Sequence, residues 1–334
     1  MDILKARMQP SLCPPDQDAR SARTTTVGLV QTRWHSDPLR HEEILREGIA
    51  AASCQGAEIV FLPELTLSRY PADTLPDVNA SSNAEALVGG ATHKFAAQAA
   101  RDHDVFVHAS MFQYSGAPDG RGLNTAIVVA PDGNIIAQTH KLHIPVTAGY
   151  FEDHYFAEGP AENPYPVHTI STDNCDLNVG LPTCWDEWFP EVARCYGLQG
   201  AELLCYPTAI GSEPDHPNFD TQPLWQQVIV GHAIANGLFI VVPNRYGSEG
   251  LLNFYGSSFI VDPFGRILAQ APRNEDAVLV AELDLNQRAD WLTLFPFYAT
   301  RRPDTYGALT QAIENPRSAS GEGINGGIPG VASR

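Results

Sequence analysis

The chain has 334 residues, 43% of them hydrophobic, and its 39 acidic residues outnumber its 21 basic ones to give a formal net charge of −18. This length is enough for one large domain or two ordinary ones, and the negative charge argues against nucleic acid and anionic membranes as partners. No run of about 18 apolar residues predicts a transmembrane helix. The charge is compatible with a cationic small-molecule ligand.

The cysteines show neither a metal-site pattern nor a disulfide framework. No two form a Cys-x-x-Cys pair, no spacing with histidine resembles a zinc site, and a chain of this length does not need disulfides for stability. Residues 1–24 lack the apolar core of a signal peptide. We therefore expect no metal, and reduced thiols in a cytoplasmic protein. The cysteines are Cys13, Cys54, Cys175, Cys184, Cys195 and Cys205.

Both ends of the chain differ in composition from the region between them. Residues 1–24 are polar and interrupted by proline, which predicts a flexible N-terminal arm. Residues 311–334 are rich in glycine and serine, which predicts a flexible C-terminal tail. No linker composition divides residues 25–310, so we expect a single domain there.

The first half of this region alternates strand and helix signals. Residues 25–31 ("TTVGLVQ") are rich in β-branched side chains and predict a strand. Residues 36–56 predict a helix, because "SDP" suits its start and Gly56 suits its end. Three further elements follow in chain order: a buried strand at 57–64, a helix within 83–103 and a strand at 104–112.

The second half contains two similar segments. Residues 126–138 ("AIVVAPDGNIIAQ") and 259–270 ("FIVDPFGRILAQ") each have a Gly-containing turn between two apolar runs, which predicts two hairpins. Hairpins among alternating strands and helices indicate mixed rather than purely parallel sheets in an α/β fold. The remaining elements expected are helices at about 187–199 and 220–237, and strands at 201–207 and 238–244.

Three of the predicted strands end at a side chain with useful chemistry. Glu64 follows one apolar run, Lys141 follows the first hairpin, and Cys184 follows "NVGLPT" just before a helix. A carboxylate can deprotonate a thiol for attack on a carbonyl, and an ammonium can stabilise the resulting oxyanion. Each residue also has an ordinary structural interpretation, as a packed thiol, a turn residue or a solvated lysine. Spacing alone leaves both interpretations open.

The motifs around these residues resemble one known family. "FLPEL" with Glu64, "HKLHIP" with Lys141 and "CWDEWFPE" with Cys184 follow the order of the Glu–Lys–Cys triad of the nitrilase, or carbon–nitrogen hydrolase, superfamily. The resemblance covers about residues 25–306. It implies a four-layer α-β-β-α sandwich with two mixed sheets, and hydrolysis of a non-peptide C–N bond without a metal or organic cofactor.

The same resemblance implies a role for each motif residue and an assembly. Cys184 would be the nucleophile and Glu64 its general base. Lys141 and the backbone N–H of Trp185 would form the oxyanion hole. The chain would form a homodimer or larger homo-oligomer, through the helices beside the nucleophile and the C-terminal segment around Arg301–Tyr306.

Further segments narrow the expected substrate. "GYFEDHYFAEGP" at 149–160 resembles the N-carbamoylputrescine amidases and places Glu152 as a second active-site glutamate. The resemblance thus implies a small carbamoyl-amine or amide substrate, first of all N-carbamoylputrescine, with putrescine, carbon dioxide and ammonia as products. Its distal ammonium needs an acidic or aromatic partner. The candidates for binding the substrate are Glu187, Glu213, Asp215, Trp188 and Tyr150.

Several alternatives stay open at this point. They are a β-ureidopropionase-type hydrolase of carbamoyl amino acids, an aliphatic amidase, a nitrilase and, from another class, a catalytically silent scaffold subunit. A carbamoyl amino acid needs a basic partner for its carboxylate, and Arg194 and Arg245 are the candidates. The intact triad argues against the scaffold. Pro182 departs from the usual apolar residue of the family and predicts an early strand end.

Overall fold

A computed structural model of the protein describes residues 1–15, 21–76 and 80–311. The chain divides into two compact units, Met1–Phe295 and Pro296–Arg334, and both large sheets lie in the first. The domain expected at 25–310 therefore ends earlier, at Phe295. The second unit contains two 3₁₀ helices, η4 (Pro303–Thr305) and η5 (Gly307–Thr310), in its described part. Apart from Gln311, the expected tail lies outside the described residues.

The first of the two sheets has seven strands in the order β1-β17-β2-β3-β4-β5-β6. It is mixed, because β17 pairs with β2 in antiparallel fashion while β2, β3 and β4 run parallel. The hairpin expected at 126–138 is confirmed as β5 and β6, which pair at one edge. The strands are β1 (Asp2–Ala6), β17 (Ala277–Asp284), β2 (Thr24–Gln31), β3 (Ile59–Phe61), β4 (Phe106–Gln113), β5 (Leu123–Val129) and β6 (Ile135–His140).

The second sheet has six strands in the order β16-β15-β12-β11-β10-β9 and is also mixed. Here β10, β11 and β12 are parallel, and the second predicted hairpin forms the antiparallel pair β15-β16. The strands are β16 (Ile267–Gln270), β15 (Phe259–Val261), β12 (Phe239–Val242), β11 (Leu203–Cys205), β10 (Asp176–Gly180) and β9 (Val167–Ser171). Two small ribbons complete the strands: β7 (Val146–Thr147) with β8 (Tyr150–Phe151), and β13 (Tyr246–Glu249) with β14 (Leu252–Tyr255).

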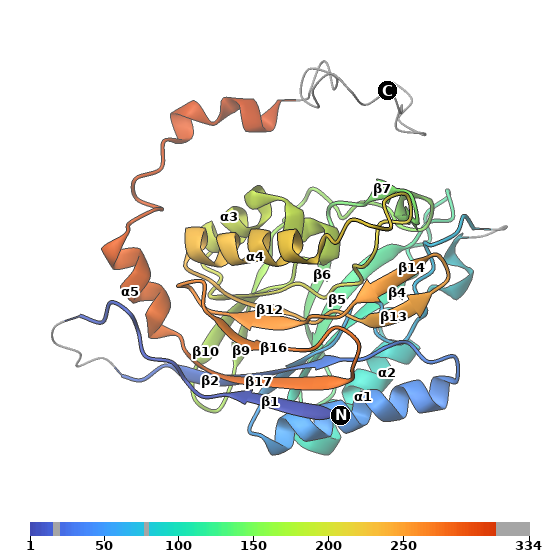
Figure 1. Ribbon diagram of the computed structural model, residues 1–334, viewed down its shortest axis with the longest axis horizontal. Coiled ribbons are helices and arrows are strands. Elements are labelled where there is room, and N and C mark those ends of the chain that lie inside the picture. Colours follow the sequence, from blue (N-terminus) through green and yellow to red (C-terminus); the bar gives the residue numbers. More distant parts are fainter. Residues whose placement is uncertain (16–20, 77–79, 312–334) are drawn as a thin grey trace. The chain divides into compact units, whose positions relative to one another are not determined.

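Helices cover the outer faces of the two sheets, so the unit has four layers (Figure 1). Between the sheets, Val27 and Phe61 of one pack with Leu177 and Phe239 of the other. Separate apolar clusters join each sheet to its own helix pair. The expected α-β-β-α sandwich is therefore confirmed. The helices are α1 (Pro38–Cys54) and α2 (Ala91–His103) on the seven-stranded sheet, and α3 (Pro190–Leu198) and α4 (Gln222–Asn236) on the six-stranded sheet.

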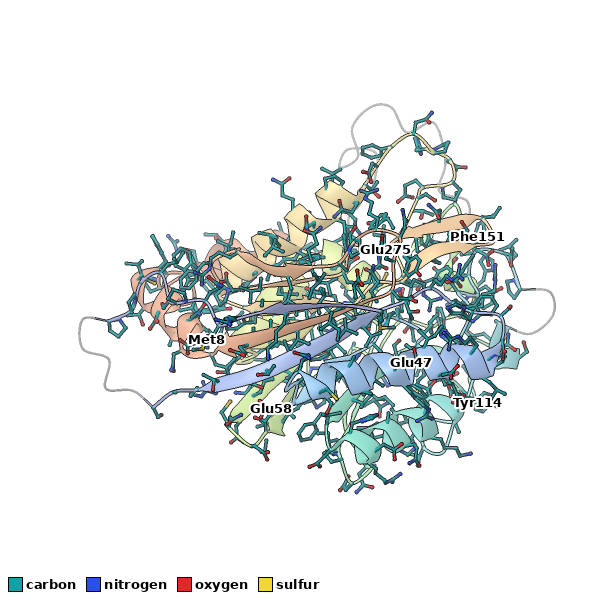
Figure 2. The ribbon with its side chains drawn as sticks, turned by 60° about the horizontal axis from the view of Figure 1, so that its bottom comes forward. Met8, Glu47, Glu58, Tyr114, Phe151 and Glu275 are labelled. Carbon is teal, nitrogen blue, oxygen red and sulfur yellow. The ribbon has the colours of Figure 1, made fainter. Side chains whose placement is uncertain are left out.

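Helix α1 shows how local chemistry fixes an element. The carboxylate of Asp37 accepts a hydrogen bond of 3.0 Å from the Leu39 N–H and so caps the helix start. Pro38 occupies the first turn, where no backbone donor is needed. At the other end Gly56 has φ +93°, a conformation that glycine adopts without strain. Glu47 lies on the outward face of the helix (Figure 2), while Leu45 faces the sheet.

The helix expected at 187–199 is divided in two. Residues Cys184–Trp188 form the 3₁₀ helix η3, and α3 begins only at Pro190. Proline disfavours the α conformation in the residue before it, and Phe189 is accordingly extended, with φ −99° and ψ 109°. The break separates the turn that carries the cysteine from the helix that covers the sheet.

The N-terminal arm expected at 1–24 is corrected by the structure. Residues Asp2–Ala6 form strand β1, which pairs in parallel with β17 from Asp2↔Ala277 to Ala6↔Ala281. A strand of five residues with most of its side chains exposed carries no clear alternation in sequence, so composition alone could not reveal it. Of the residues that are placed, none belongs to a helix long and apolar enough to cross a membrane. The elements not yet named are α5 (Asn286–Leu294), η1 (Ala80–Asn83) and η2 (Glu152–His154).

Candidate active site

The residues singled out by the three motifs meet in the interior, between the ends of different elements. Glu64 follows β3, Lys141 follows β6, and Cys184 opens η3 after β10. Glu152 opens η2. These side chains are almost completely removed from solvent, with exposures of 0% for Glu64, 1% for Lys141 and Glu152, and 4% for Cys184. The three motif residues and Glu152 therefore belong to one buried group of side chains.

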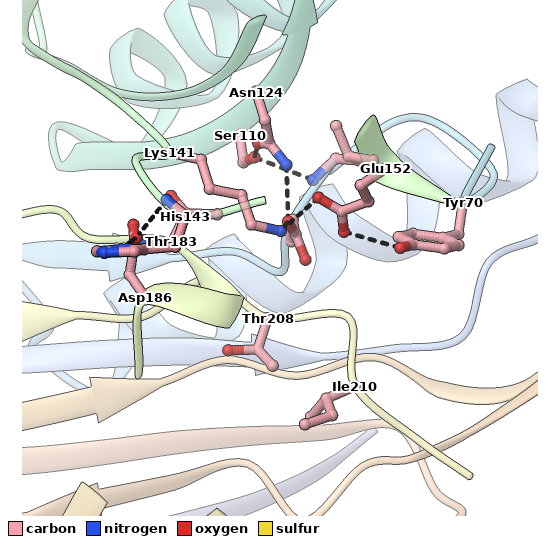
Figure 3. A network of polar contacts seen from close by, with 12 residues as sticks. Tyr70, Ser110, Asn124, Lys141, His143, Glu152, Thr183, Asp186, Thr208 and Ile210 are labelled. Carbon is pink, nitrogen blue, oxygen red and sulfur yellow. Dashed lines mark hydrogen bonds and ion pairs between the residues drawn. The ribbon is translucent and has the colours of Figure 1, made fainter. Parts of the chain in front are cut away.

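Lys141 lies between two carboxylates (Figure 3). Its Nζ is 3.0 Å from Glu64 Oε1 and 2.6 Å from Glu152 Oε2. Burial by itself would lower the pKa of Lys141, but Glu152 and Glu64 outweigh burial and raise it well above the ordinary value. Burial raises the pKa of Glu152 to about 7, although Lys141 opposes this rise. The lysine therefore stays charged in a site that water does not reach.

Two polar residues that the sequence analysis missed donate hydrogen bonds to the two carboxylates. Asn124 Nδ2 donates to Glu64 Oε1 at 2.7 Å, and Tyr70 OH donates to Glu152 Oε1 at 2.7 Å. Asn124 is a polar residue near the start of the apolar strand β5, and a polar residue in such a strand is a signal by which it could have been found. Tyr70 lies in a loop with no recognisable pattern. Both partners help to compensate the cost of burying carboxylates.

A buried ion pair between Arg245 and Glu249 supports the backbone that carries Glu64. Arg245 Nη2 donates to the carbonyl oxygens of Glu64 at 2.6 Å and Leu65 at 3.1 Å, and its Nη1 lies 2.8 Å from Glu249 Oε1. Leu65 has φ +49°, a strained value for a side chain of this kind. Arg245 is only 3% exposed. It is therefore committed to the support of Glu64, and this engagement argues against its use for a substrate carboxylate.

Cys184 is held in an unusual backbone conformation. Its φ is +45°, and its N–H donates to the Pro207 carbonyl at 3.0 Å. Burial raises the pKa of the thiol well above its ordinary value, Glu64 adds to the rise, and Lys141 opposes it. The resting group is thus a neutral thiol that needs a base. Oxygen Oε2 of Glu64 has no hydrogen-bond partner among the described residues, so it has capacity for a proton.

Asp186 ties the lysine segment to the cysteine turn. Its Oδ2 accepts from the N–H groups of Thr183 at 3.0 Å and Leu142 at 3.4 Å. Its Oδ1 accepts from the backbone N–H of His143 at 3.0 Å and from the ring Nδ1 of the same residue at 2.7 Å. Figure 3 shows this side chain between the two segments. The residue just after Lys141 and the one just before Cys184 therefore share one buried carboxylate.

The candidate substrate-binding residues are spread over three environments. Glu187 is completely buried beside the cluster, where burial raises its pKa well above the ordinary value. Tyr150 is buried, and its hydroxyl accepts from the Gly211 N–H at 3.1 Å. Burial, followed by the charge of Glu213, raises the pKa of this tyrosine. Glu213 and Trp188 are half-buried, and Asp215 is exposed and so not part of the buried cluster.

Two further residues from the sequence analysis are Arg194, a candidate partner for a substrate carboxylate, and Trp185, whose backbone N–H is expected in the oxyanion hole. Arg194 lies on α3, where its Nη2 donates to the carbonyl of Ala235 on α4. Trp185 is half-buried in η3, directly after the cysteine. Within the described part of the chain, no group of three or more His, Cys, Asp or Glu side chains has the arrangement of a metal site.

Comparison with known proteins places this geometry in a family. The model of the carbon–nitrogen hydrolase family matches residues 26–292, which include all of the clustered residues. The chain belongs to the carbon–nitrogen hydrolase family. It is therefore an enzyme that hydrolyses carbon–nitrogen bonds of linear amides, and the scaffold alternative is excluded.

Individual members of the carbon–nitrogen hydrolase family show the same likeness over most of their length. The chain is 33% identical to a citrullinase of Francisella tularensis over 85% of this chain and 98% of that protein. It is also 33% identical to an N-carbamoylputrescine amidase of Solanum tuberosum, over 87% and 96% respectively. A solved structure of a carbon–nitrogen hydrolase from Helicobacter pylori G27 superposes with a TM-score of 0.73 at 30% identity, covering 86% of this chain and 99% of that one.

Proposed function

We propose that this carbon–nitrogen hydrolase cleaves a carbamoylated amine, with N-carbamoylputrescine as the best substrate and putrescine, carbon dioxide and ammonia as products. The observation that carries the chemistry is the buried cluster in which Lys141 joins Glu64 to Glu152 beside the Cys184 thiol. A base, a cation and a nucleophile are the parts that acyl transfer through a covalent intermediate requires.

The first half-reaction forms a bond between sulfur and carbon. Oε2 of Glu64 takes the thiol proton as Sγ of Cys184 attacks the carbamoyl carbon. Lys141 and the Trp185 backbone N–H stabilise the oxyanion. Trp185 directly follows the nucleophile in η3, and Lys141 is buried in a site with little water. Glu64 then gives its proton to the leaving amine, and the C–N bond breaks to leave a carbamoyl thioester.

The second half-reaction restores the thiol. Glu64 takes a proton from water, which attacks the same carbon, and the C–S bond breaks as Cys184 regains its proton. The released carbamic acid decomposes to carbon dioxide and the nitrogen compound that stayed on the carbon, which is putrescine if ammonia leaves first and ammonia if putrescine leaves first. Glu152 keeps Lys141 charged and in place through both steps, since it contributes most to raising the pKa of the lysine. Tyr70 in turn holds Glu152.

Charge around the site supports an amine rather than an amino acid as the carbamoyl carrier. Arg245 is engaged with Glu249 and the Glu64 backbone, whereas the half-buried Glu213 lies near Tyr150. Glu213 is thus the acid best placed to bind the distal ammonium. A carboxylate–ammonium contact is worth about 1.5–3 kcal/mol, or roughly ten- to a hundredfold in specificity. The N-carbamoylputrescine amidase relative supports the same substrate.

A ureido amino acid such as citrulline is the second candidate, because the citrullinase relative is equally similar. The test is the kcat/KM for ammonia release from N-carbamoylputrescine, citrulline, N-carbamoyl-β-alanine and a simple aliphatic amide. We expect the carbamoyl-amine to be the best substrate and its advantage to shrink as salt screens the acidic site. A higher kcat/KM for either carbamoyl amino acid would overturn the proposed substrate but leave the triad chemistry intact.

A further inference from the structure

Glu187 is a buried carboxyl group that the mechanism above does not use. It is the fourth residue of η3, the short 3₁₀ helix that Cys184 opens. Its exposure is 0%. Glu64 and Lys141 both lie close enough to shift its pKa, and Glu187 in turn raises the pKa of the Cys184 thiol. The carboxyl group therefore lies in the same short turn and the same buried group of side chains as the reacting sulfur.

One oxygen of this carboxyl group has a protein partner and the other does not. Oε2 accepts from the Thr208 hydroxyl at 3.2 Å, and the backbone carbonyl accepts from His232 Nε2 at 2.9 Å. Oε1 makes no hydrogen bond to any residue that the structure places. The Trp225 indole lies close enough to lower the carboxyl pKa, but its N–H does not reach hydrogen-bond geometry. A buried acceptor without a donor is costly, so this oxygen indicates a ligand that supplies one.

A ureido substrate carries a donor where a simple amide does not. In the reaction proposed above, the carbonyl oxygen faces Lys141 and the leaving nitrogen faces Glu64. The third substituent on the carbon is a second nitrogen in a ureido group, whichever nitrogen leaves first. In a carboxamide the third substituent is a carbon atom, which has no N–H.

We propose that Glu187 Oε1 accepts a hydrogen bond from the ureido nitrogen that stays on the carbonyl carbon, and thereby makes the site selective for ureido compounds over carboxamides. This proposal rests on the proposed function and adds the residue that recognises its substrate class. The carboxyl group was first considered as a partner for the distal ammonium. Its place in the buried turn that Cys184 opens assigns it instead to the reacting end of the substrate.

The selectivity follows from what each substrate leaves unpaired. A ureido substrate satisfies Oε1, whereas a carboxamide sets a CH₂ group against it. Sites built to hydrogen-bond a substrate N–H discriminate strongly against analogues that lack it, because the buried polar group then stays unpaired. We expect a preference of about ten- to a hundredfold in kcat/KM for the ureido compound over its CH₂ analogue.

The test compares N-carbamoylputrescine with 6-aminohexanamide, which has CH₂ in place of the N–H that joins the carbonyl to the chain and keeps the distal ammonium. With ammonia as the leaving group in both compounds, this N–H or CH₂ is the substituent that stays on the carbonyl carbon. Replacing Glu187 with Leu removes the acceptor and should bring the ratio of the two kcat/KM values to within a few-fold of one. Glu187→Gln keeps an acceptor oxygen and should preserve the preference. Glu213→Gln is the matched control, because an ammonium partner serves both substrates and its loss should lower both values equally.

Each other outcome has a definite meaning. If Glu187→Leu lowers both substrates equally or leaves the ratio unchanged, the role of Glu187 is wrong. If the wild-type enzyme turns over the carboxamide but no ureido compound, the proposed function itself fails. Should Glu187→Leu not fold, the Kd of the two compounds for Cys184→Ala answers the same question. Tenfold or tighter binding of the ureido compound supports the proposal, and equal Kd values overturn it.

Discussion

The thiol of Cys184 is a weak nucleophile until something removes its proton. Burial and Glu64 raise its pKa, so a standing thiolate is disfavoured and the proton must move during attack. The positive φ of this residue fixes the backbone from which the thiol projects at the start of η3, directly before Trp185. Reactivity therefore depends on the neighbours of the thiol rather than on the thiol alone.

Replacing Cys184 with alanine should abolish turnover and leave the fold intact. The change removes the nucleophile but takes only one sulfur atom from the interior. Cys205→Ala is the matched control, since Cys205 is also buried but lies in the core between the sheets. It should keep full activity and lose about 1–2 kcal/mol of unfolding free energy. Steady-state turnover by Cys184→Ala at wild-type rates would remove this residue from the mechanism.

Lys141 should not tolerate replacement by arginine. Its buried Nζ lies within 3.0 Å of two carboxylates, and a guanidinium is larger and planar, so Lys141→Arg should be badly impaired despite its charge. Lys141→Met should lower kcat by about 10²–10³-fold, the typical cost of one oxyanion donor. Both are measured by single-turnover kinetics, with circular dichroism as the check on folding. Activity of Lys141→Met within a few-fold of wild type would contradict its role.

At the level of elements, the sequence predicted those helices and strands whose ends are set by residues within the same segment. Helix α1 has its cap, its proline and its final glycine within one segment, and it forms as expected. Pro190 also indicated a break, but the sequence analysis did not use this signal. The structure accordingly has two helices, η3 and α3, where one was expected. Strand β1 depends on pairing with β17, which lies at the far end of the unit, and a five-residue segment cannot reveal such a partner.

For the site too, residues in local motifs were predictable and partners that are distant in the sequence were not. Glu64, Lys141 and Cys184 lie in recognisable motifs and could be named from the sequence. Tyr70 contacts Glu152 across 82 positions of the chain, and no local pattern indicates that hydrogen bond. Whether an acid such as Glu187 is buried or exposed is likewise decided by the packing of distant elements. Residue types were thus predictable, but the partners that fix their charge states were not.

The link that Asp186 makes between two elements should matter more for rate than for binding. Asp186→Ala leaves the N–H groups of Thr183, Leu142 and His143 without their acceptor, so the lysine and cysteine segments should separate slightly. We expect kcat to fall at least tenfold with little change in KM, slower alkylation of Cys184 by iodoacetamide, and a loss on the order of 3 kcal/mol in unfolding free energy.

Asp186→Asn is the informative partner variant, because it keeps one carbonyl oxygen for these donors. It should recover part of the alkylation rate as well as part of the stability. A purely structural role would give a lower melting temperature but an unchanged alkylation rate and an unchanged pH profile of alkylation. That pattern would refute the positioning role.

For the whole molecule, buried histidines should make stability depend on pH. Burial lowers the pKa of His108 from 6.5 to about 3, so the folded state does not take up the proton that the unfolded state binds below pH 6.5. The unfolded state then holds more protons, and stability falls as pH falls from about 6.5 towards 3. At pH 5.5 this residue should cost about 1 kcal/mol relative to pH 7.5.

The measurement is urea unfolding of wild type and His108→Asn at pH 7.5 and 5.5. Buried acids with raised pKa values, Glu152 among them, act in the opposite direction, so only the difference between the two proteins isolates the histidine. The variant should lose about 1 kcal/mol less than wild type on acidification. An equal loss in both proteins would mean that His108 does not contribute to the acid sensitivity.

The molecule should associate with itself, as the family resemblance implies. Helix α3 exposes 45% of Leu198, and α4 exposes 47% of Leu224. A charge at such a position would be buried unpaired in an interface. Light scattering at micromolar concentration should show a two-fold dimer or a multiple of it. Leu198→Glu should weaken it, whereas Leu39→Glu on the outer face of α1 should not. A stable, active monomer would contradict this expectation.

The place of β17 between β1 and β2 has a consequence for synthesis of the protein on the ribosome. Strand β2 is translated about 250 residues ahead of β17, an interval of roughly 12 to 50 s at about 5–20 residues per second. Throughout that time the nascent chain carries β2 without its antiparallel neighbour, and an unpaired apolar edge can capture a strand from another chain. Completion of this sheet, and with it the burial of the hydrolase core, must therefore wait until the last strand of the unit has been made.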